Sequence, residues 1–429
     1  MPATDPITEL LAGRYRDPET GDLLATECAA IEIADSLAGR ELELVRAQGA
    51  FEKVAVIADA DTQAALGARV HAALAQGLAT QSIVLPTQPH ADTDTVARLN
   101  MLVASGVDAI VSVGSGTVTD LSKMVALARD VPLFAFPTAP SMNGYASLSA
   151  SITMAGVKRS VRARTPRALF FDLAVIAAAP ARLIRAGLGD SLCRPTAQAD
   201  WLLAHLLLDR PYREVPFVLL ADDERELFAR AGVLVARDLV AMRHLVRTLV
   251  LSGLGMTLAG GSYPASQGEH LVSHYLEASW PAGVPRPLHG EQVGVCTLAV
   301  AALQTRILAR ATPPALAPST VTEAALAHRF GAERGAAYWA ELRHKQLDPV
   351  RTDAANARLA RDWDAIRARI DRVRIATDAL AGVLVAAGAA TTPEAIGCSR
   401  GLFEEAMRDA RLQRDRYTFL DLAADAGLV

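Results

Sequence analysis

The stretch AIVSVGSGTVTDLSKMVALA (residues 109–128) passes from a β-branched run, through two glycines, into a helical pattern. Ala109–Val113 has the length and composition of a buried strand. Gly114 and Gly116 interrupt the run, and apolar residues at helical spacing follow from near Val118. A strand, a tight turn and a helix in this order form the repeating unit of α/β folds. The stretch therefore predicts a parallel sheet.

The same alternation extends on both sides of this stretch, although residues 1–50 carry few cues. Four further runs have the length and composition of strands: 53–58, 82–85, 131–136 and 170–176. Helical patterns occupy 62–79 and 93–105. Short strands alternating with longer helices are typical of βαβ units. In such sheets, ligands bind at the carboxyl ends of the strands.

The pattern changes after Pro180. From Ala181 onward we find almost no strand pattern, and helices are predicted over 182–209, 222–251, 265–280, 290–311, 322–331, 353–374, 377–387 and 400–411. We therefore predict two domains. An α/β nucleotide-binding domain occupies residues 1–180, and an all-α domain that binds metal and substrate occupies residues 181–429.

Composition and charge exclude several classes of protein. The net charge of −4 shows no basic footprint for nucleic acid. No apolar run approaches the roughly 20 residues that cross a bilayer. The N-terminus has no cationic region followed by an apolar one, which argues against a signal peptide. The four cysteines are scattered, which is typical of reduced thiols, so we expect a cytoplasmic protein.

The turn after residue 113 is a candidate dinucleotide site. Gly114, Ser115, Gly116 and Thr117 would let backbone N–H groups approach a phosphate at a helix N-terminus. The motif is shorter than a full dinucleotide fingerprint, and a plain tight turn is the alternative. Asp59 follows the strand at 53–58. Its carboxylate is suited to hydrogen bonds with a ribose diol, which favours NAD over NADP. The alternative for Asp59 is an ordinary turn residue.

Three histidines gather in GSYPASQGEHLVSHYLEASWPAGVPRPLHGEQ (residues 261–292). His270 and His274 are four residues apart and share one face of a predicted helix. The loop rich in Pro and Gly at 281–287 can fold His289 back toward His270. Neutral imidazoles facing one cavity suit a borderline metal such as Zn²⁺. The alternative is a set of ordinary histidines on an amphipathic helix.

A carboxylate for such a site stands upstream, at Asp190 after Gly187-Leu-Gly189. An acid in this context is often a helix cap. Together with His270 and His289, Asp190 would instead complete a three-ligand site that leaves a coordination position open for substrate. Arg194 lies four residues further on, and one helix would place it on the same face as Asp190. There it would bind an anionic part of the substrate.

Five segments in this order resemble the glycerol-1-phosphate dehydrogenases, of the metal-dependent polyol dehydrogenase and dehydroquinate synthase superfamily. The closing Arg416–Leu422 also fits, and the likeness spans most of the chain after residue 50. The five segments are 114–123 (GSGTVTDLSK), 137–141 (PTAPS), 189–190 (GD), 265–274 (ASQGEHLVSH) and 288–294 (LHGEQVG).

The resemblance implies a dehydroquinate synthase-like fold and a set of site residues. Asp190, His270 and His289 match the metal ligands, and His274 matches a histidine near the reacting centre. Arg194 replaces a histidine ligand of the iron-type alcohol dehydrogenases, which favours a three-ligand site. The residues that match the dinucleotide-contacting regions are Asp59, Gly114, Ser115, Gly116, Thr117, Asp120, Lys123, Thr138 and Ser141.

Two departures from the family pattern fall where substrate is expected. The family's Asp-Gly is Asn143-Gly144 here, and its Ser-Arg-Pro is Ser262-Tyr263-Pro264. Asn143 removes a negative charge and Arg194 adds a positive one, and both changes favour an anionic substrate. Tyr263 acts in the opposite sense, because it removes a possible anion partner.

These observations predict a metal-dependent oxidoreductase that interconverts a polyol phosphate like glycerol 1-phosphate and a ketone like dihydroxyacetone phosphate. The expected cofactors are NAD, with NADP possible, and a divalent metal, with Zn ahead of Ni or Fe. We expect a homo-oligomer that acts on a small molecule and has no nucleic acid or membrane partner. The alternatives are a carbocycle-forming lyase, a dehydrogenase for a non-phosphorylated polyol, and a non-catalytic nucleotide-binding protein.

Overall fold

The computed structural model describes residues 5–154 and 157–428; the first four residues of the N-terminal segment considered above lie outside it. Contacts group the chain into two units. The sheet unit comprises Met1–Ser191 and Glu214–Gly261, and the helical unit comprises Leu192–Arg213 and Ser262–Val429. These bounds differ from a single division after residue 180, because α12 (Leu239–Leu258) packs on α7 (Leu173–Ala177) and α8 (Ala181–Ser191). The division into functional domains at 1–180 and 181–429 stays a prediction.

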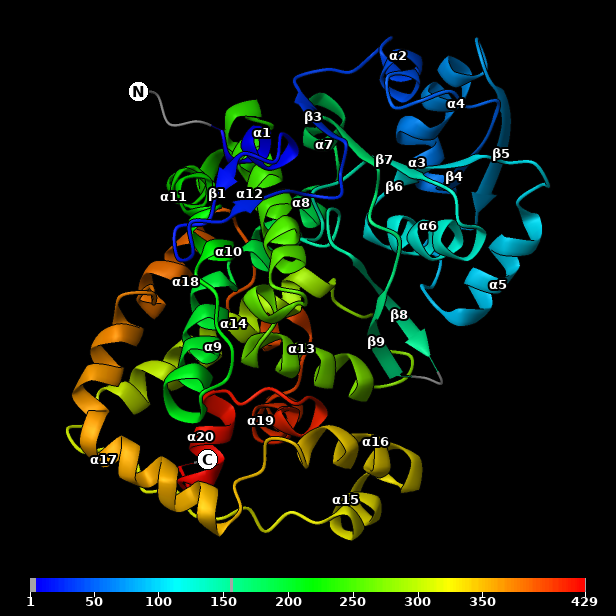
Figure 1. The fold of residues 1–429 in the computed structure, drawn as a ribbon. Coiled ribbons are helices and arrows are strands. Elements are labelled where there is room, and N and C mark those ends of the chain that lie inside the picture. The colour runs from blue at the N-terminus through cyan, green and yellow to red at the C-terminus, as the bar shows by residue number, and fades with distance from the viewer. Residues whose placement is uncertain (1–4, 155–156, 429) are drawn as a thin grey trace. The chain divides into compact units, whose positions relative to one another are not determined.

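The sheet unit is built on a six-stranded parallel sheet (Figure 1). Its order is β3-β10-β7-β6-β4-β5, and every neighbouring pair is parallel, which confirms the predicted α/β fold class. The strands are β3 (Ala30–Ala34), β4 (Lys53–Asp59), β5 (Ala79–Leu85), β6 (Ala109–Gly114), β7 (Leu133–Pro137) and β10 (Ala168–Asp172).

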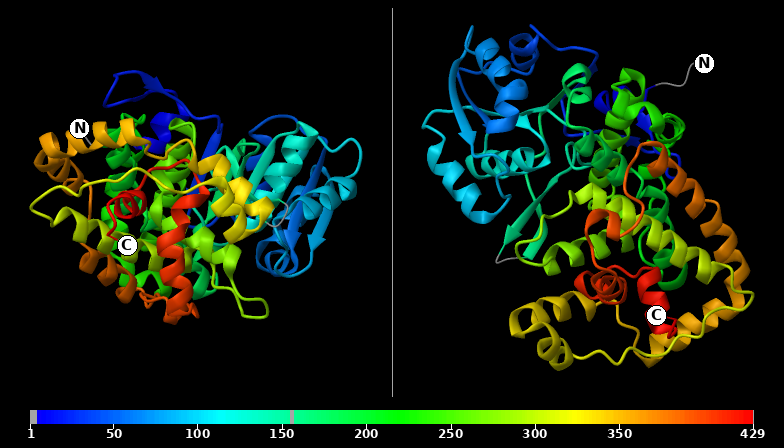
Figure 2. Two further views of the ribbon diagram at one scale, coloured as in Figure 1. Left: turned by 90° about the horizontal axis from the view of Figure 1, so that it is seen from below. Right: turned by 180° about the vertical axis from the view of Figure 1, so that it is seen from behind.

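Alternating side chains send the sheet's apolar residues into two separate cores. On β4, Val54 and Val56 pack with α2 (Glu41–Arg46) and α4 (Ala68–Leu74). Ala55 and Ile57 point to the opposite face, toward α5 (Thr93–Leu102) and α6 (Gly116–Arg129). Both faces are therefore covered by helices, as parallel sheets require (Figures 1 and 2).

Three features of this unit differ from the sequence expectations. Residues 1–50 contribute an edge strand, β3. The strand expected over 170–176 ends at Asp172, because the Asp172 carboxylate accepts a hydrogen bond from Val175 N (3.3 Å) and starts α7. The polar segment after Tyr145 leads into an antiparallel hairpin formed by β8 (Ser149–Met154) and β9 (Val157–Arg162).

The remaining elements of the sheet unit are short, apart from α12. This 20-residue helix is long and apolar enough to span a bilayer by length and composition, which corrects the expectation that no such run exists. Because 67% of its apolar window is buried inside the protein, we interpret it as a core helix. The short elements are α1 (Pro6–Leu11), β1 (Tyr15–Arg16), β2 (Leu23–Leu24), α3 (Ala60–Thr62), η1 (Gln63–Gly67), α10 (Val215–Val218), α11 (Ala221–Ala229) and η2 (Ala231–Ala236).

The helical unit contains no strand among its described residues, as predicted. Its main core joins α9, α13, α14, α17, α19 and α20, and α17 lies at the edge of the unit (Figure 2). Helices α16 and α20 were not anticipated. The elements are α9 (Arg194–Leu208), η3 (Tyr263–Ala265), α13 (Gly268–Ser279), α14 (His289–Leu308), α15 (Glu323–Phe330), α16 (Ala332–Leu342), α17 (Pro349–Asp371), α18 (Thr377–Ala386), η4 (Glu394–Ile396), α19 (Arg400–Asp409), η5 (Ala410–Gln413) and α20 (Phe419–Asp425).

A helix break separates Asp190 from Arg194. The single helix expected over 182–209 is in fact two, with α8 ending at Ser191 and α9 beginning at Arg194. Pro195 explains the break, because proline has no N–H to continue a helix but is well accommodated in a first turn. The inference that Asp190 and Arg194 share one helical face is therefore wrong.

Candidate nucleotide and metal sites

The carboxyl edge of the sheet brings the predicted nucleotide-contacting segments together. Strand β4 ends at Asp59, β6 ends at Gly114, and the β6–β7 register places Gly114 opposite Pro137. Strands β5 and β6 lie on opposite sides of β4, so the chain changes direction there. Open α/β sheets bind ligands in the crevice that forms at such a point.

The turn at Gly114 opens α6 with its backbone N–H groups at this edge. A Cβ added at Gly114 would lie 2.5 Å from the Val118 side chain, so only glycine fits. Ser115 makes no side-chain cap, and Gly116 N donates a long hydrogen bond to Ser141 Oγ (3.4 Å). Thr138 N donates to Gly114 O (3.2 Å). A 14-residue helix that begins this way offers partial positive charge to a phosphate.

Asp59 is buried at the end of β4 and begins the next helical turn. Its Oδ1 accepts a hydrogen bond from Thr62 N (2.8 Å), and Thr62 Oγ1 accepts one from Asp59 N (3.0 Å). This reciprocal cap agrees with the alternative interpretation, in which Asp59 is an ordinary turn residue. The cap uses one carboxylate oxygen, so a ribose contact through the other stays a prediction.

Asp120 and Lys123 lie on the buried side of α6. Lys123 Nζ donates to the carbonyls of Gly144 (2.5 Å), Ser147 (2.9 Å) and Ser149 (3.1 Å). Asp120 Oδ2 accepts from Ser151 N (3.1 Å). Burial raises the pKa of Asp120 to about 6 and lowers the pKa of Lys123 to about 8. These side chains anchor the 144–151 segment, and their direct contact with a dinucleotide stays a prediction.

The loop that follows β7 packs against the helix carrying Asp190. Asn143 N donates to Asp190 Oδ2 (2.7 Å), which joins two residues singled out by sequence. The approach depends on Gly187 of α8, where an added Cβ would lie 1.6 Å from Pro140 O. The Asp190 side chain is buried, so this hydrogen bond fixes its orientation.

In the helical unit, all three predicted histidines form one cluster. His270 and His274 lie on α13, and His289 is the first residue of α14. The ring centroids of His270 and His289 are 5.2 Å apart, and those of His274 and His289 are 5.7 Å apart. The prediction that the loop folds His289 back toward His270 is therefore confirmed.

Carboxylates lie against the Nδ1 atoms of two of these imidazoles. His270 Nδ1 is 3.0 Å from Glu269 Oε1, and His289 Nδ1 is 3.3 Å from Glu277 Oε1. Histidines that bind metals commonly donate one ring N–H to a carboxylate, which directs the other nitrogen at the metal. Sequence reasoning missed both glutamates. The spacing of Glu277 from His270 and His274, at helix positions i+7 and i+3, was the available signal.

Arg194 lies at the start of α9 and contacts the next turn of its own helix. Its Nη1 donates to Gln198 Oε1 (2.8 Å), and Gln198 Nε2 donates to Tyr212 OH (3.0 Å). The expected placement of Arg194 beside Asp190 rested on a continuous helix, which does not exist. A role for Arg194 in binding substrate stays a prediction.

The amino-acid sequence is similar to those of alcohol and polyol phosphate dehydrogenases. Residues 32–180 match the profile of the family described as iron-containing alcohol dehydrogenase. The glycerol-1-phosphate dehydrogenase [NAD(P)+] of Halalkalibacterium halodurans is 34% identical over 256 residues, which cover 58% of this chain. That alignment spans 64% of the relative, which is less than two thirds of its length.

A second relative is covered more fully, and a solved structure supports the fold. The chain superimposes on glycerol dehydrogenase from Schizosaccharomyces pombe with a TM-score of 0.57 and 17% identity, covering 87% of this chain and 94% of that one. The glycerol-1-phosphate dehydrogenase [NAD(P)+] of Thermococcus kodakarensis is 32% identical over 273 residues, covering 63% of this chain and 76% of the relative. The chain thus belongs to the glycerol-1-phosphate dehydrogenase family of NAD(P)-dependent oxidoreductases.

Proposed function

We propose that this protein uses NAD and a divalent metal to interconvert a polyol phosphate like glycerol 1-phosphate and a ketone like dihydroxyacetone phosphate. Family membership supports the reaction class. The observation that carries the metal requirement is the pairing of His270 with Glu269 and of His289 with Glu277, which leaves the Nε2 atoms as ligands.

Asp190, His270 and His289 would hold the metal, and this donor set fits a divalent ion. Two imidazoles and one carboxylate suit Zn²⁺ best, with Ni²⁺ and Fe²⁺ as alternatives. When bound, the metal supplies a positive charge that polarises the oxygen of the substrate's alcohol or ketone. His274 would face the substrate, because its ring stacks on that of His289.

The sheet unit would bind and orient the nicotinamide dinucleotide. The N-terminus of α6 and the backbone of residues 114–117 would hold the pyrophosphate, and Asp59 the adenine ribose. Thr138 and Ser141, at the same edge, would contact the nucleotide. The nicotinamide, when bound, would accept the hydride from the alcohol carbon or return it to the ketone carbon, and solvent or a nearby base would take up or supply the hydroxyl proton.

The decisive experiment is a panel of substrates assayed by NADH absorbance. Glycerol 1-phosphate, glycerol 3-phosphate and glycerol are tested with NAD or NADP and with added Zn²⁺, Ni²⁺ or Fe²⁺. We expect glycerol 1-phosphate with NAD to give the highest kcat/KM. A carbocycle-forming lyase of the same fold would show no net production of NADH, and equal rates with glycerol would move the proposal to a neutral polyol.

Asp59→Ser is expected to relax the preference for NAD. In the unmodified protein the Asp59 carboxylate would repel the 2′-phosphate of NADP. Serine keeps a cap for the helical turn that Asp59 begins, so the fold should persist. We expect the ratio of kcat/KM for NAD to that for NADP to fall by about tenfold or more, since 1.4 kcal/mol corresponds to a factor of ten. Equal efficiency with both cofactors before the substitution would contradict this role.

Glu277→Gln is expected to weaken metal binding about 10- to 100-fold, because the amide holds the imidazole of His289 less strongly. Metal content is measured after dialysis against a graded series of chelator concentrations. Glu404→Gln serves as the control, because Glu404 forms an exposed pair with Arg400 on α19. If Glu277→Gln and the control both bind the metal as tightly as the unmodified protein, the Glu277 carboxylate does not support a metal site at His289.

We also propose a reducing compartment. All four cysteines are buried in the structure and none is in a disulfide, and thiols of this kind are typical of cytoplasmic proteins. Assembly into a homo-oligomer stays a prediction, which sedimentation can test.

A further inference from the structure

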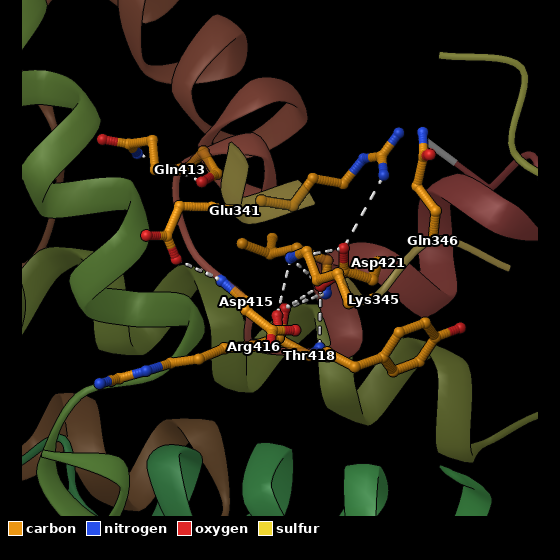
Figure 3. Close-up of polar contacts among 12 residues, drawn as sticks. Glu341, Lys345, Gln346, Gln413, Asp415, Arg416, Thr418 and Asp421 are labelled. Carbon is orange, nitrogen blue, oxygen red and sulfur yellow. Dashed lines mark hydrogen bonds and ion pairs between the residues drawn. The ribbon is translucent and has the colours of Figure 1, made fainter. Parts of the chain in front are cut away.

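The guanidinium of Arg416 is held rigidly beside the segment that leads into α13. Its Nη2 donates to Ser262 Oγ (2.8 Å), and its Nη1 donates to Ser266 O. The charged group also lies over the ring of Tyr263, 4.8 Å from the centroid. In Figure 3 the Arg416 side chain extends away from the contacts that surround Lys345 and Asp421.

The backbone around Arg416 is fixed by three other contacts. Lys345 Nζ donates to Arg416 O (2.7 Å), and Asp415 N donates to Glu341 Oε2 (3.1 Å). Gln413 Nε2 donates to Leu271 O on α13 (2.9 Å). The side chain therefore loses little additional freedom when it binds a ligand, which favours affinity.

Among the described residues, the Arg416 guanidinium makes no direct hydrogen bond to a carboxylate. Its hydrogen bonds within the described part of the chain go to a carbonyl and a hydroxyl, and it forms no ion pair there. Burial lowers the pKa of Arg416 to about 10, and the charge of Arg414 acts in the same direction. The charges of Glu269 and Glu341 act in the opposite direction and only partly offset this shift. By contrast, the neighbouring cation Lys345, which donates to the Arg416 carbonyl, is paired with Asp421 (2.8 Å). A partly buried cation whose charge is only partly balanced is stabilised further when an anion binds.

The position of Arg416 ties this charge to the histidine cluster. Ser266, which it holds, is four residues before His270, and four residues span at most about 14 Å of chain. Tyr263 stacks in turn on Trp201 of α9, with ring centroids 5.7 Å apart. The cation thus lies on a platform formed by the segment that leads directly into the helix of His270 and His274.

We infer that Arg416 binds the phosphate of the substrate, and that Tyr263 and Ser262 hold its guanidinium in place. This inference rests on the proposed function. The two contacts named above use two of the five N–H donors of the guanidinium. The remaining donors suit a phosphate, which arginine recognises through paired hydrogen bonds. Arg416 is then a substrate-binding residue that sets the preference for a phosphorylated over a free polyol.

The test compares Arg416→Gln and Arg416→Lys with the unmodified enzyme in the direction of ketone reduction. Dihydroxyacetone phosphate and free dihydroxyacetone are reduced with NADH, and inorganic phosphate is tested as a competitive inhibitor. For Arg416→Gln we expect KM for the phosphorylated ketone to rise about 10- to 100-fold. The kcat/KM for the free ketone and the KM for NADH should stay within twofold. Arg416→Lys should recover part of the loss, because it restores the charge without the planar fork.

Arg351→Gln is the matched control. Arg351 also donates to backbone carbonyls in the helical unit, those of His344 and Gln346, but it lies on α17. The control should leave all these constants unchanged. A merely structural role for Arg416 would raise KM for both ketones alike, or lower metal content, and would overturn the inference. So would an unchanged KM for the phosphorylated ketone in Arg416→Gln. If the unmodified enzyme reduces neither ketone, the proposed function itself fails, and that outcome is distinct from the others.

Discussion

His289→Ala is expected to lose its bound metal and to slow turnover by about a thousandfold or more. His289 begins α14 and lies in ring contact with His270 and His274, so its removal opens the imidazole cluster. Polarisation of the substrate oxygen by a metal contributes several kcal/mol to catalysis, and each 1.36 kcal/mol is a factor of ten. Metal content by atomic emission and turnover of glycerol 1-phosphate by NADH absorbance are measured on the same sample.

Two further variants make this test specific. Asp190→Asn should show the same loss of metal, because an amide is a far weaker ligand than a carboxylate. The control is His328→Ala, which removes an exposed imidazole from α15 in the same unit. Far-UV circular dichroism establishes that all three variants are folded. Metal content and turnover at the unmodified level in His289→Ala and Asp190→Asn would show that the site lies elsewhere.

The parts of the fold that local chemistry determines were predictable from sequence. Gly114 marks the end of a β-branched run and the start of a helix, and the structure confirms this turn. The helical spacing of His270 and His274 and the loop before His289 likewise predicted the imidazole cluster. In each case the signal lies within about 20 residues and depends on periodicity or on glycine and proline.

The parts that tertiary contacts determine were not predictable. Pro195 divides one expected helix into two, and apolar periodicity continues through the break, so the pattern conceals it. The edge strand β3 forms because β10 pairs with it, 138 residues further along (Ala168 with Ala30). The carboxylates on His270 and His289 were missed because each depends on the rotation of a side chain in the packed unit.

These corrections change which arginine best explains a preference for anionic substrates. The sequence argument favoured Arg194 over position 263, because a continuous helix would fix Arg194 beside Asp190. The structure removes that reason and shows Arg194 bonded to Gln198. At position 263 it places a tyrosine ring under the guanidinium of Arg416. The arginine of the family pattern is therefore replaced by Tyr263 in this chain. The positive charge over the Tyr263 ring comes instead from Arg416, in the C-terminal segment.

Lys345→Met is expected to destabilise the helical unit by about 3–5 kcal/mol, because it leaves the buried Asp421 carboxylate without its cation. Lys345 and Asp421 are each 1% exposed. The ammonium lies 2.8 Å from Asp421 Oδ1 and 3.0 Å from Oδ2 (Figure 3). Burial lowers the pKa of Lys345, and the Asp421 carboxylate opposes that shift. The midpoint of urea unfolding, followed by fluorescence, measures the loss.

The pair also connects two distant segments, which makes its effect larger than that of a surface contact. Asp421 accepts hydrogen bonds from Thr418 N (2.9 Å) and Thr418 Oγ1 (3.1 Å) at the start of α20, and Lys345 follows α16. Arg400→Gln is the matched control, because the Arg400–Glu404 pair is exposed and should contribute at most about 1 kcal/mol. Adding Asp421→Asn to Lys345→Met should recover part of the stability by removing the unpaired charge. If Lys345→Met costs no more than Arg400→Gln, the buried pair does not stabilise the fold in the way that its geometry predicts.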